Sequence, residues 1–161
     1  MNYLTLTLIW LHVFFIVLWL GGFLFQVMVI FPALASLSPQ GRSELLQKVV
    51  GRGERLFMPV MGLALVFGFL LLIEMFGLNL GALVNSRSWI YLISGGTLGL
   101  IAFLKFTFID RPGIVALTSG KGGETAFSGS SRPSPSMMIL LIVQILLLMG
   151  AFTLMILGTN F

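Results

Sequence analysis

The chain has 161 residues, of which 58% are hydrophobic and only 9% are charged, and it contains no cysteine. Soluble domains carry about 25% charged residues, so this composition excludes an ordinary soluble protein and is typical of an integral membrane protein. The lack of cysteine excludes disulfides and thiolate metal sites. The net charge of +4 does not indicate a nucleic-acid partner, because the charges flank apolar runs, where Lys and Arg meet lipid headgroups.

Four apolar runs predict an all-α, four-helix bundle that spans the lipid bilayer. A hydrocarbon core about 30 Å thick requires about 20 apolar residues in a helix. The first predicted span is longer than the core and must tilt or protrude. The spans cover residues 4–34, 56–79, 89–109 and 137–157. We therefore treat residues 1–161 as a single transmembrane domain.

Two of the segments that connect the spans have different compositions and predict different structures. Residues 39–55 begin with proline after a serine, a pattern that starts helices, and then mix Leu and Val with Arg and Lys. This mixture predicts a short amphipathic helix lying in the headgroup region. Residues 112–136 are rich in Gly, Ser and Pro, which predicts a flexible loop.

The basic residues predict the orientation of the chain in the membrane. Seven of them lie in two loops on one side of the bundle, and Arg87 lies alone on the other side. The seven are Arg42, Lys48, Arg52, Arg55, Arg111, Lys121 and Arg132. The positive-inside rule places both of these loops in the cytoplasm and the N- and C-termini outside.

His12 is the only histidine of the chain and lies inside the first span. An imidazole within a membrane span is a candidate functional group. With the termini outside, His12 and Glu74 share the outer leaflet, so the carboxylate could bind the imidazole and fix its tautomer. The alternative is that Glu74 reaches the headgroups instead, as long polar side chains near span ends do.

Other polar residues lie within the spans or at their ends. Gln26 and Gln144 are expected to form hydrogen bonds between helices. Lys105 is expected to extend toward the headgroups. Asp110 and Arg111 are interpreted as an interfacial pair at the end of the third span.

Glycines in the third span permit two interpretations. Gly95 and Gly99 are four residues apart, a spacing that allows close packing between membrane helices. Together with Gly96, they could also leave room for a flat cofactor between helices, where bundles hold such groups. The spacing alone favours close packing.

Two sets of short motifs lie in the first two spans. The first set consists of His12, Trp19, Gly22 and Pro32. The second set, at the start of the second span, consists of Arg55-Leu-Phe-Met-Pro59, followed by Met61, Phe67 and Gly68. These motifs, and the four-span layout with a polar third loop over the whole chain, resemble the HemJ and CopD-like family of four-helix membrane proteins.

This resemblance implies a cofactor and an activity. HemJ proteins bind haem b and oxidise protoporphyrinogen IX, and CopD proteins are implicated in copper handling. The first-helix histidine of the family, matched here by His12, is a haem ligand. The family also has a lysine early in the third helix, whereas residues 89–94 read Trp-Ile-Tyr-Leu-Ile-Ser. The missing lysine argues against the oxidase activity without deciding whether the protein is an enzyme, and no catalytic residue is assigned.

Three functions are compatible with these observations. The first is a haem b-associated protein of the bacterial inner (cytoplasmic) membrane, acting in electron transfer or as an accessory subunit beside other membrane subunits or in a homo-oligomer. The second is copper transport or delivery through His12 and the methionines, and the third is a structural subunit without a cofactor. The candidate cofactor-binding residues are His12, which is also the candidate metal ligand, Trp19, Gly22, Gly95, Gly96 and Gly99.

Overall fold

The structure is a computed structural model that describes residues 2–79, 81, 84–86, 88–112 and 135–159. Every regular element in these ranges is helical, and four helical stretches are long and apolar enough to cross a membrane. They are Tyr3–Leu34, Gln40–Phe76, Trp89–Asp110 and Met138–Gly158. The prediction of an all-α protein with four helices able to cross a membrane is confirmed for these residues. The loop predicted for 112–136 lies almost entirely outside the described residues.

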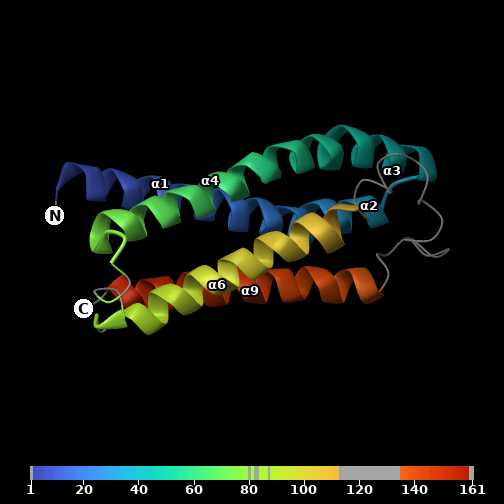
Figure 1. Ribbon diagram of the computed structural model, residues 1–161. Helices are drawn as coiled ribbons and strands as arrows, with labels where there is room; N and C mark the ends of the chain where they lie inside the picture. Colours follow the sequence, from blue (N-terminus) through green and yellow to red (C-terminus); the bar gives the residue numbers. More distant parts are fainter. Residues whose placement is uncertain (1, 80, 82–83, 87, 113–134, 160–161) are drawn as a thin grey trace.

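The first two spans form a long helical hairpin (Figure 1). Its first arm consists of α1 (Tyr3–Phe25), η1 (Gln26–Ile30) and α2 (Phe31–Ala35), and its second arm of α3 (Pro39–Leu45), η2 (Leu46–Val50) and α4 (Gly51–Phe76). Asn2 caps the start of α1, since its Oδ1 accepts a hydrogen bond from the Thr5 backbone N–H at 2.7 Å. Gly77 ends α4 with φ +63°, a conformation that glycine adopts without strain.

The structure differs from the prediction for residues 39–55, because this segment does not form a separate interfacial helix. It continues without a break into the second span, and the helical stretch Gln40–Phe76 has 37 residues. At 1.5 Å per residue this stretch is about 55 Å long, well beyond a hydrocarbon core of about 30 Å. The glycines at its start do not interrupt it. The amphipathic pattern therefore belongs to the end of a long helix that extends past the apolar region.

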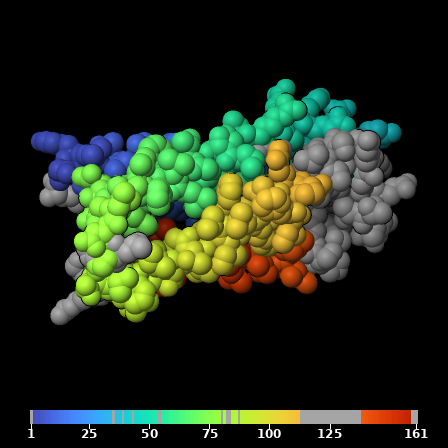
Figure 2. Space-filling view, in the orientation of Figure 1, coloured from blue at the N-terminus to red at the C-terminus, as the bar shows by residue number. Residues whose placement is uncertain are grey.

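The last two spans form a second pair of antiparallel helices. They consist of α6 (Trp89–Lys105) with η3 (Phe106–Asp110), and of α9 (Pro135–Thr159). Helix α1 packs along α4 and α6 packs along α9, whereas contacts between the two pairs are much sparser. Figure 1 shows the two pairs as layers, with the start of α1 and the end of α9 at the same end of the bundle. In Figure 2 the surface is hollowed between α4 (green) and α6 (yellow). We call the boundary between the two pairs the seam.

The core of the bundle is apolar and lies along the seam. Its largest fully buried side chains are those of Trp19, Phe23, Leu34, Met61, Phe106 and Gln144. The ring of Phe23 meets that of Phe106 edge-on, with 5.9 Å between the ring centroids. Many apolar side chains on the outer faces of the helices are exposed. Exposed apolar helix faces fit a lipid environment, and the four apolar helices indicate an integral membrane protein.

A buried ion pair lies near the end of the third span, and its lysine also forms a hydrogen bond to α9. Lys105 Nζ lies 2.9 and 2.7 Å from the two carboxylate oxygens of Asp110 and donates a further hydrogen bond to the Leu140 carbonyl oxygen of α9 at 2.9 Å. Residues 106–110 form a π-helix, in which residues five apart are hydrogen-bonded and so lie on one side. The expectation that Lys105 extends to the headgroups is therefore wrong, and Asp110 pairs with Lys105.

Gln144 forms the predicted hydrogen bond between helices. Its Nε2 donates to the Ala102 carbonyl oxygen of α6 at 3.1 Å. This bond and the bond from Lys105 Nζ to the Leu140 carbonyl oxygen both connect α9 to α6, so the second helix pair is joined by polar contacts as well as by packing.

Candidate functional site

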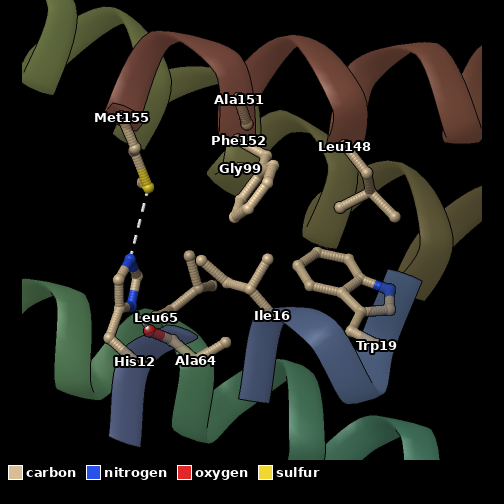
Figure 3. Close-up of a pocket in the computed structure, with 10 residues that line it drawn as sticks. All are labelled: His12, Ile16, Trp19, Ala64, Leu65, Gly99, Leu148, Ala151, Phe152 and Met155. Carbon is tan, nitrogen blue, oxygen red and sulfur yellow. Dashed lines mark hydrogen bonds between the residues drawn. The ribbon is translucent and has the colours of Figure 1, made fainter. Parts of the chain in front are cut away.

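A small cavity of about 30 Å³ lies in the seam between the two helix pairs. All four spans contribute to its walls: His12 and Trp19 from α1, Ala64 and Leu65 from α4, Gly99 from α6 and Met155 from α9, with further apolar side chains between them (Figure 3). The predicted residues His12, Trp19 and Gly99 are thus brought together. Such convergence of all spans on one histidine makes this the candidate functional site.

Both ring nitrogens of His12 have a partner, one from each helix pair. Nδ1 lies 2.7 Å from the carbonyl oxygen of Ala64 on α4. Nε2 lies 3.3 Å from the sulfur of Met155 on α9, as the dashed line in Figure 3 shows. A backbone carbonyl can only accept a hydrogen bond, so Nδ1 carries the proton and donates it to Ala64. In a neutral imidazole this leaves a lone pair on Nε2.

The arrangement of His12 and Met155 suits a metal ligand pair. The Nε2 lone pair and the thioether sulfur face each other across the seam. With the proton on Nδ1, neither of these two atoms carries a hydrogen that it could donate to the other. Metal-binding histidines commonly donate their other ring N–H to a backbone carbonyl, which fixes the tautomer and the ring orientation. Ala64 provides that carbonyl here. The site therefore offers one nitrogen and one sulfur donor in an apolar surrounding.

Glu74 does not provide the hydrogen bond predicted for His12. Its Oε1 accepts a hydrogen bond from Asn2 Nδ2 at 2.8 Å and lies 3.4 Å from Thr5 Oγ1, both at the start of α1. The contact joins the ends of α1 and α4, about two helical turns from His12. Glu74 thus acts at the end of the bundle, and the backbone carbonyl of Ala64 replaces it as the partner of the imidazole.

The predicted cofactor-binding glycines have different surroundings. At Gly22 an added Cβ would overlap the ring of Phe57 on α4, and at Gly95 it would lie 3.0 Å from Met155 Cγ and 3.1 Å from the Ala151 carbonyl oxygen. These two glycines allow helices to approach closely. Gly96 has no neighbour within 4 Å of an added Cβ, and Gly99 has only Leu65 Cδ2 at 3.9 Å. Of these glycines, Gly99 is the one that lines the cavity.

Two buried polar atoms at the seam have no hydrogen-bond partner among the described residues. They are Nε1 of Trp19 and Oε1 of Gln144. Trp19 is 2% exposed and Gln144 is fully buried. An unpaired buried donor lowers stability by about 1–3 kcal/mol relative to a paired one. The indole ring of Trp19 therefore stabilises the bundle by packing, and its N–H opposes that stabilisation.

Replacing Trp19 with phenylalanine tests this balance. Trp19→Phe retains an aromatic ring and removes the unpaired N–H, so we expect a free energy of unfolding within about 1 kcal/mol of wild type. Unfolding in increasing SDS, followed by circular dichroism, measures it. Trp10→Phe, at a position on α1 that is 70% exposed, is the matched control. A loss above about 2 kcal/mol for Trp19→Phe alone would contradict the expectation that removing the unpaired N–H offsets the loss of ring volume.

Met155, Ala64 and Gly68 belong to the site but were not predicted as site residues. Met155 is one of nine methionines without a repeated pattern, and a helix carbonyl leaves no signal in a sequence. The predicted topology did offer one signal for Met155. The start of the first span and the end of the fourth lie at the same end of the bundle, so residues in the C-terminal turns of α9 lie at the same depth as His12. Gly68 appeared in the family motif without an assigned role.

Comparison of the chain with family models, with curated proteins and with solved structures finds no match in any of the three. The similarity of His12, Trp19 and Gly22 to the HemJ and CopD-like motif therefore stays a prediction.

Proposed function

We propose that this membrane protein binds copper(I) between its helix pairs, with His12 Nε2 and Met155 Sδ as ligands, and that it acts in copper handling. The supporting observation is the 3.3 Å separation of these two atoms across the seam. Imidazole nitrogen and thioether sulfur suit Cu(I). Both donors are neutral, and a monovalent ion leaves a smaller charge in an apolar bundle than a divalent one does.

The size of the cavity supports a single ion. Bonds from a first-row metal to nitrogen and sulfur are about 2.0 and 2.3 Å long. Their sum exceeds the observed separation of 3.3 Å between Nε2 and Sδ, so one ion can contact both atoms. A volume of about 30 Å³ exceeds the roughly 10–15 Å³ that holds one water molecule. The cavity that His12 and Met155 line thus has enough volume for one ion.

A hard divalent cation has little to bind in this bundle. Such ions prefer several carboxylate or carbonyl oxygens. Among the residues that the structure describes, no group of three or more His, Cys, Asp or Glu side chains comes together. The donors that do converge on the cavity are the imidazole and the thioether, and this donor set favours a soft metal.

Haem b is the second candidate, and the sparse seam favours it. Histidine and methionine are both known ligands of haem iron, and here His12 and Met155 come from opposite helix pairs. The present cavity has no room for a macrocycle, so haem requires the α1–α4 pair to move away from the α6–α9 pair. The contacts within each pair could remain during such a separation, because few contacts join the pairs. Bound haem would supply redox chemistry, with His12 as its ligand.

The placement of the protein in the cell is part of the proposal. We place the protein in a bacterial inner membrane, and the positive-inside rule is the reason for proposing that its N- and C-termini lie outside. His12 then lies in the outer leaflet, and the metal exchanges with the outer side of the membrane. Other membrane subunits or a second copy of the chain are proposed partners, because a transport or delivery role requires a protein that supplies or accepts the metal.

Replacing Met155 with leucine tests the role of the thioether. Met155→Leu keeps the apolar volume and removes the sulfur, so we expect a Cu(I) affinity at least about tenfold lower with an intact fold. Anaerobic competition with a chromogenic Cu(I) chelator measures the affinity. Met149→Leu is the matched control, since Met149 lies on the same helix and is 45% exposed. Equal affinities for the two variants would exclude Met155 as a ligand.

A further inference from the structure

The imidazole ring of His12 lies directly against the backbone of α4 at Gly68. A Cβ added to Gly68 would lie 2.6 Å from Cε1 and 2.9 Å from Nδ1 of the ring. Carbon atoms in van der Waals contact stay about 3.5–4.0 Å apart. No side chain other than that of glycine therefore fits between the ring and the helix at this position.

Glycine at this position also uncovers the carbonyl that His12 uses. Side chains of an α-helix lean toward its N-terminus and cover the preceding turn. The side chain of residue 68 would therefore lie over the turn that begins at Ala64, four residues earlier. Without that side chain, Nδ1 of His12 reaches the Ala64 carbonyl oxygen at 2.7 Å. Gly68 and the Ala64 carbonyl together form a notch in α4 that receives one edge of the imidazole.

We propose that Gly68 is a positioning residue that holds His12 in the tautomer protonated at Nδ1. The notch admits the Nδ1–H edge of the ring, and this directs the Nε2 lone pair to Met155, 3.3 Å away across the seam. The contacts between α1 and α4 alone determine this tautomer. Its consequence for the metal rests on the proposed function.

The single histidine of the chain makes the tautomer directly measurable. Protein labelled with ¹⁵N only in histidine gives the signals of one imidazole, and NMR in detergent micelles without metal, at mildly alkaline pH, distinguishes the two neutral tautomers. We expect predominantly the form protonated at Nδ1 for wild type. A wild-type ring protonated mainly at Nε2 would overturn the proposal before any substitution is made.

Gly68→Ala is the decisive variant, and Gly62→Ala is its matched control. Both lie on α4, but an added Cβ at Gly62 has no neighbour within 4 Å. We expect Gly68→Ala to displace the ring from the Ala64 carbonyl and to give a mixture of tautomers, while Gly62→Ala keeps the wild-type form. A folded Gly68→Ala variant with the wild-type tautomer would refute the role of Gly68. If Gly68→Ala does not fold, the wild-type measurement still decides the tautomer.

Metal binding separates this inference from the proposed function. Competition with a Cu(I) chelator should show at least about a tenfold loss of affinity for Gly68→Ala, within the 10–100-fold range for residues that orient a ligand, and none for Gly62→Ala. If the tautomer shifts as expected but wild type binds no Cu(I), Gly68 still positions His12 and the copper proposal fails. If wild type binds Cu(I) and Gly68→Ala binds it equally well, Gly68 has no positioning role for the metal.

Discussion

Replacing His12 with alanine should abolish metal binding and leave the bundle inserted and folded. The substitution removes the only imidazole of the chain and with it the nitrogen donor that faces Met155. It also removes the hydrogen bond to the Ala64 carbonyl, but one such bond between membrane helices contributes only about 0.6 kcal/mol on average. We therefore expect no stoichiometric metal in His12→Ala, and a free energy of unfolding within about 2 kcal/mol of wild type.

Two comparisons make the His12 result interpretable. Val17→Ala, at a 53% exposed position of α1, controls for the loss of side-chain volume and should keep full metal binding. His12→Met restores a soft donor without the hydrogen bond to Ala64, so it should recover part of the Cu(I) affinity. Metal content and helical circular dichroism are measured on the same samples. Undiminished metal in folded His12→Ala would remove His12 from the site.

Replacing Lys105 alone should destabilise the protein by about 3–5 kcal/mol, the usual effect of leaving one charge of a buried pair without its partner. The Lys105 and Asp110 side chains are only 10% and 5% exposed, and Lys105 also donates to the Leu140 carbonyl. In Lys105→Met, the Asp110 carboxylate loses both hydrogen bonds from Nζ. Unfolding in SDS, followed by circular dichroism, provides the free energy.

The double variant Lys105→Met/Asp110→Leu should recover most of that loss, because a buried ion pair and an apolar pair of similar volume often have similar stability. The exposed pair of Lys48 and Glu44, with 3.2 Å between its charged atoms, supplies the matched control. Lys48→Met should change the free energy of unfolding by less than about 1 kcal/mol. If Lys105→Met changed the free energy of unfolding no more than Lys48→Met does, the buried ion pair and the bond from Lys105 to α9 would not stabilise the protein.

The four spans could be predicted because each is marked by one long, continuous run of apolar residues. An apolar run of about 20 residues has few structural alternatives, and all four runs became helices. The segment 39–55 was harder, since an amphipathic pattern does not show whether a helix lies on the membrane or continues from a span. The pairing of Lys105 with Asp110 was also not predictable, because residues five apart share a side only in a π-helix.

The site could be predicted only in part. His12 was recognisable as the single imidazole in a membrane span, and Trp19 and Gly99 do line its cavity. The predicted partner Glu74 instead contacts Asn2 and Thr5, because similar depth does not mean the same helix face. Whether Met155 and Gly68 face His12 depends on how α9 and α4 are rotated about their axes. A single sequence does not determine such rotations.

Metal analysis of the wild-type protein, purified in mild detergent, with an absorption spectrum of the same sample before and after reduction, tests the central claim most directly. Our proposal predicts one copper per chain after exposure to Cu(I), and no Soret band. A Soret band with reduced b-type bands would contradict the copper assignment and establish haem b as the group bound at the seam. Absence of both copper and haem would contradict a metal-binding role for His12 and Met155 altogether.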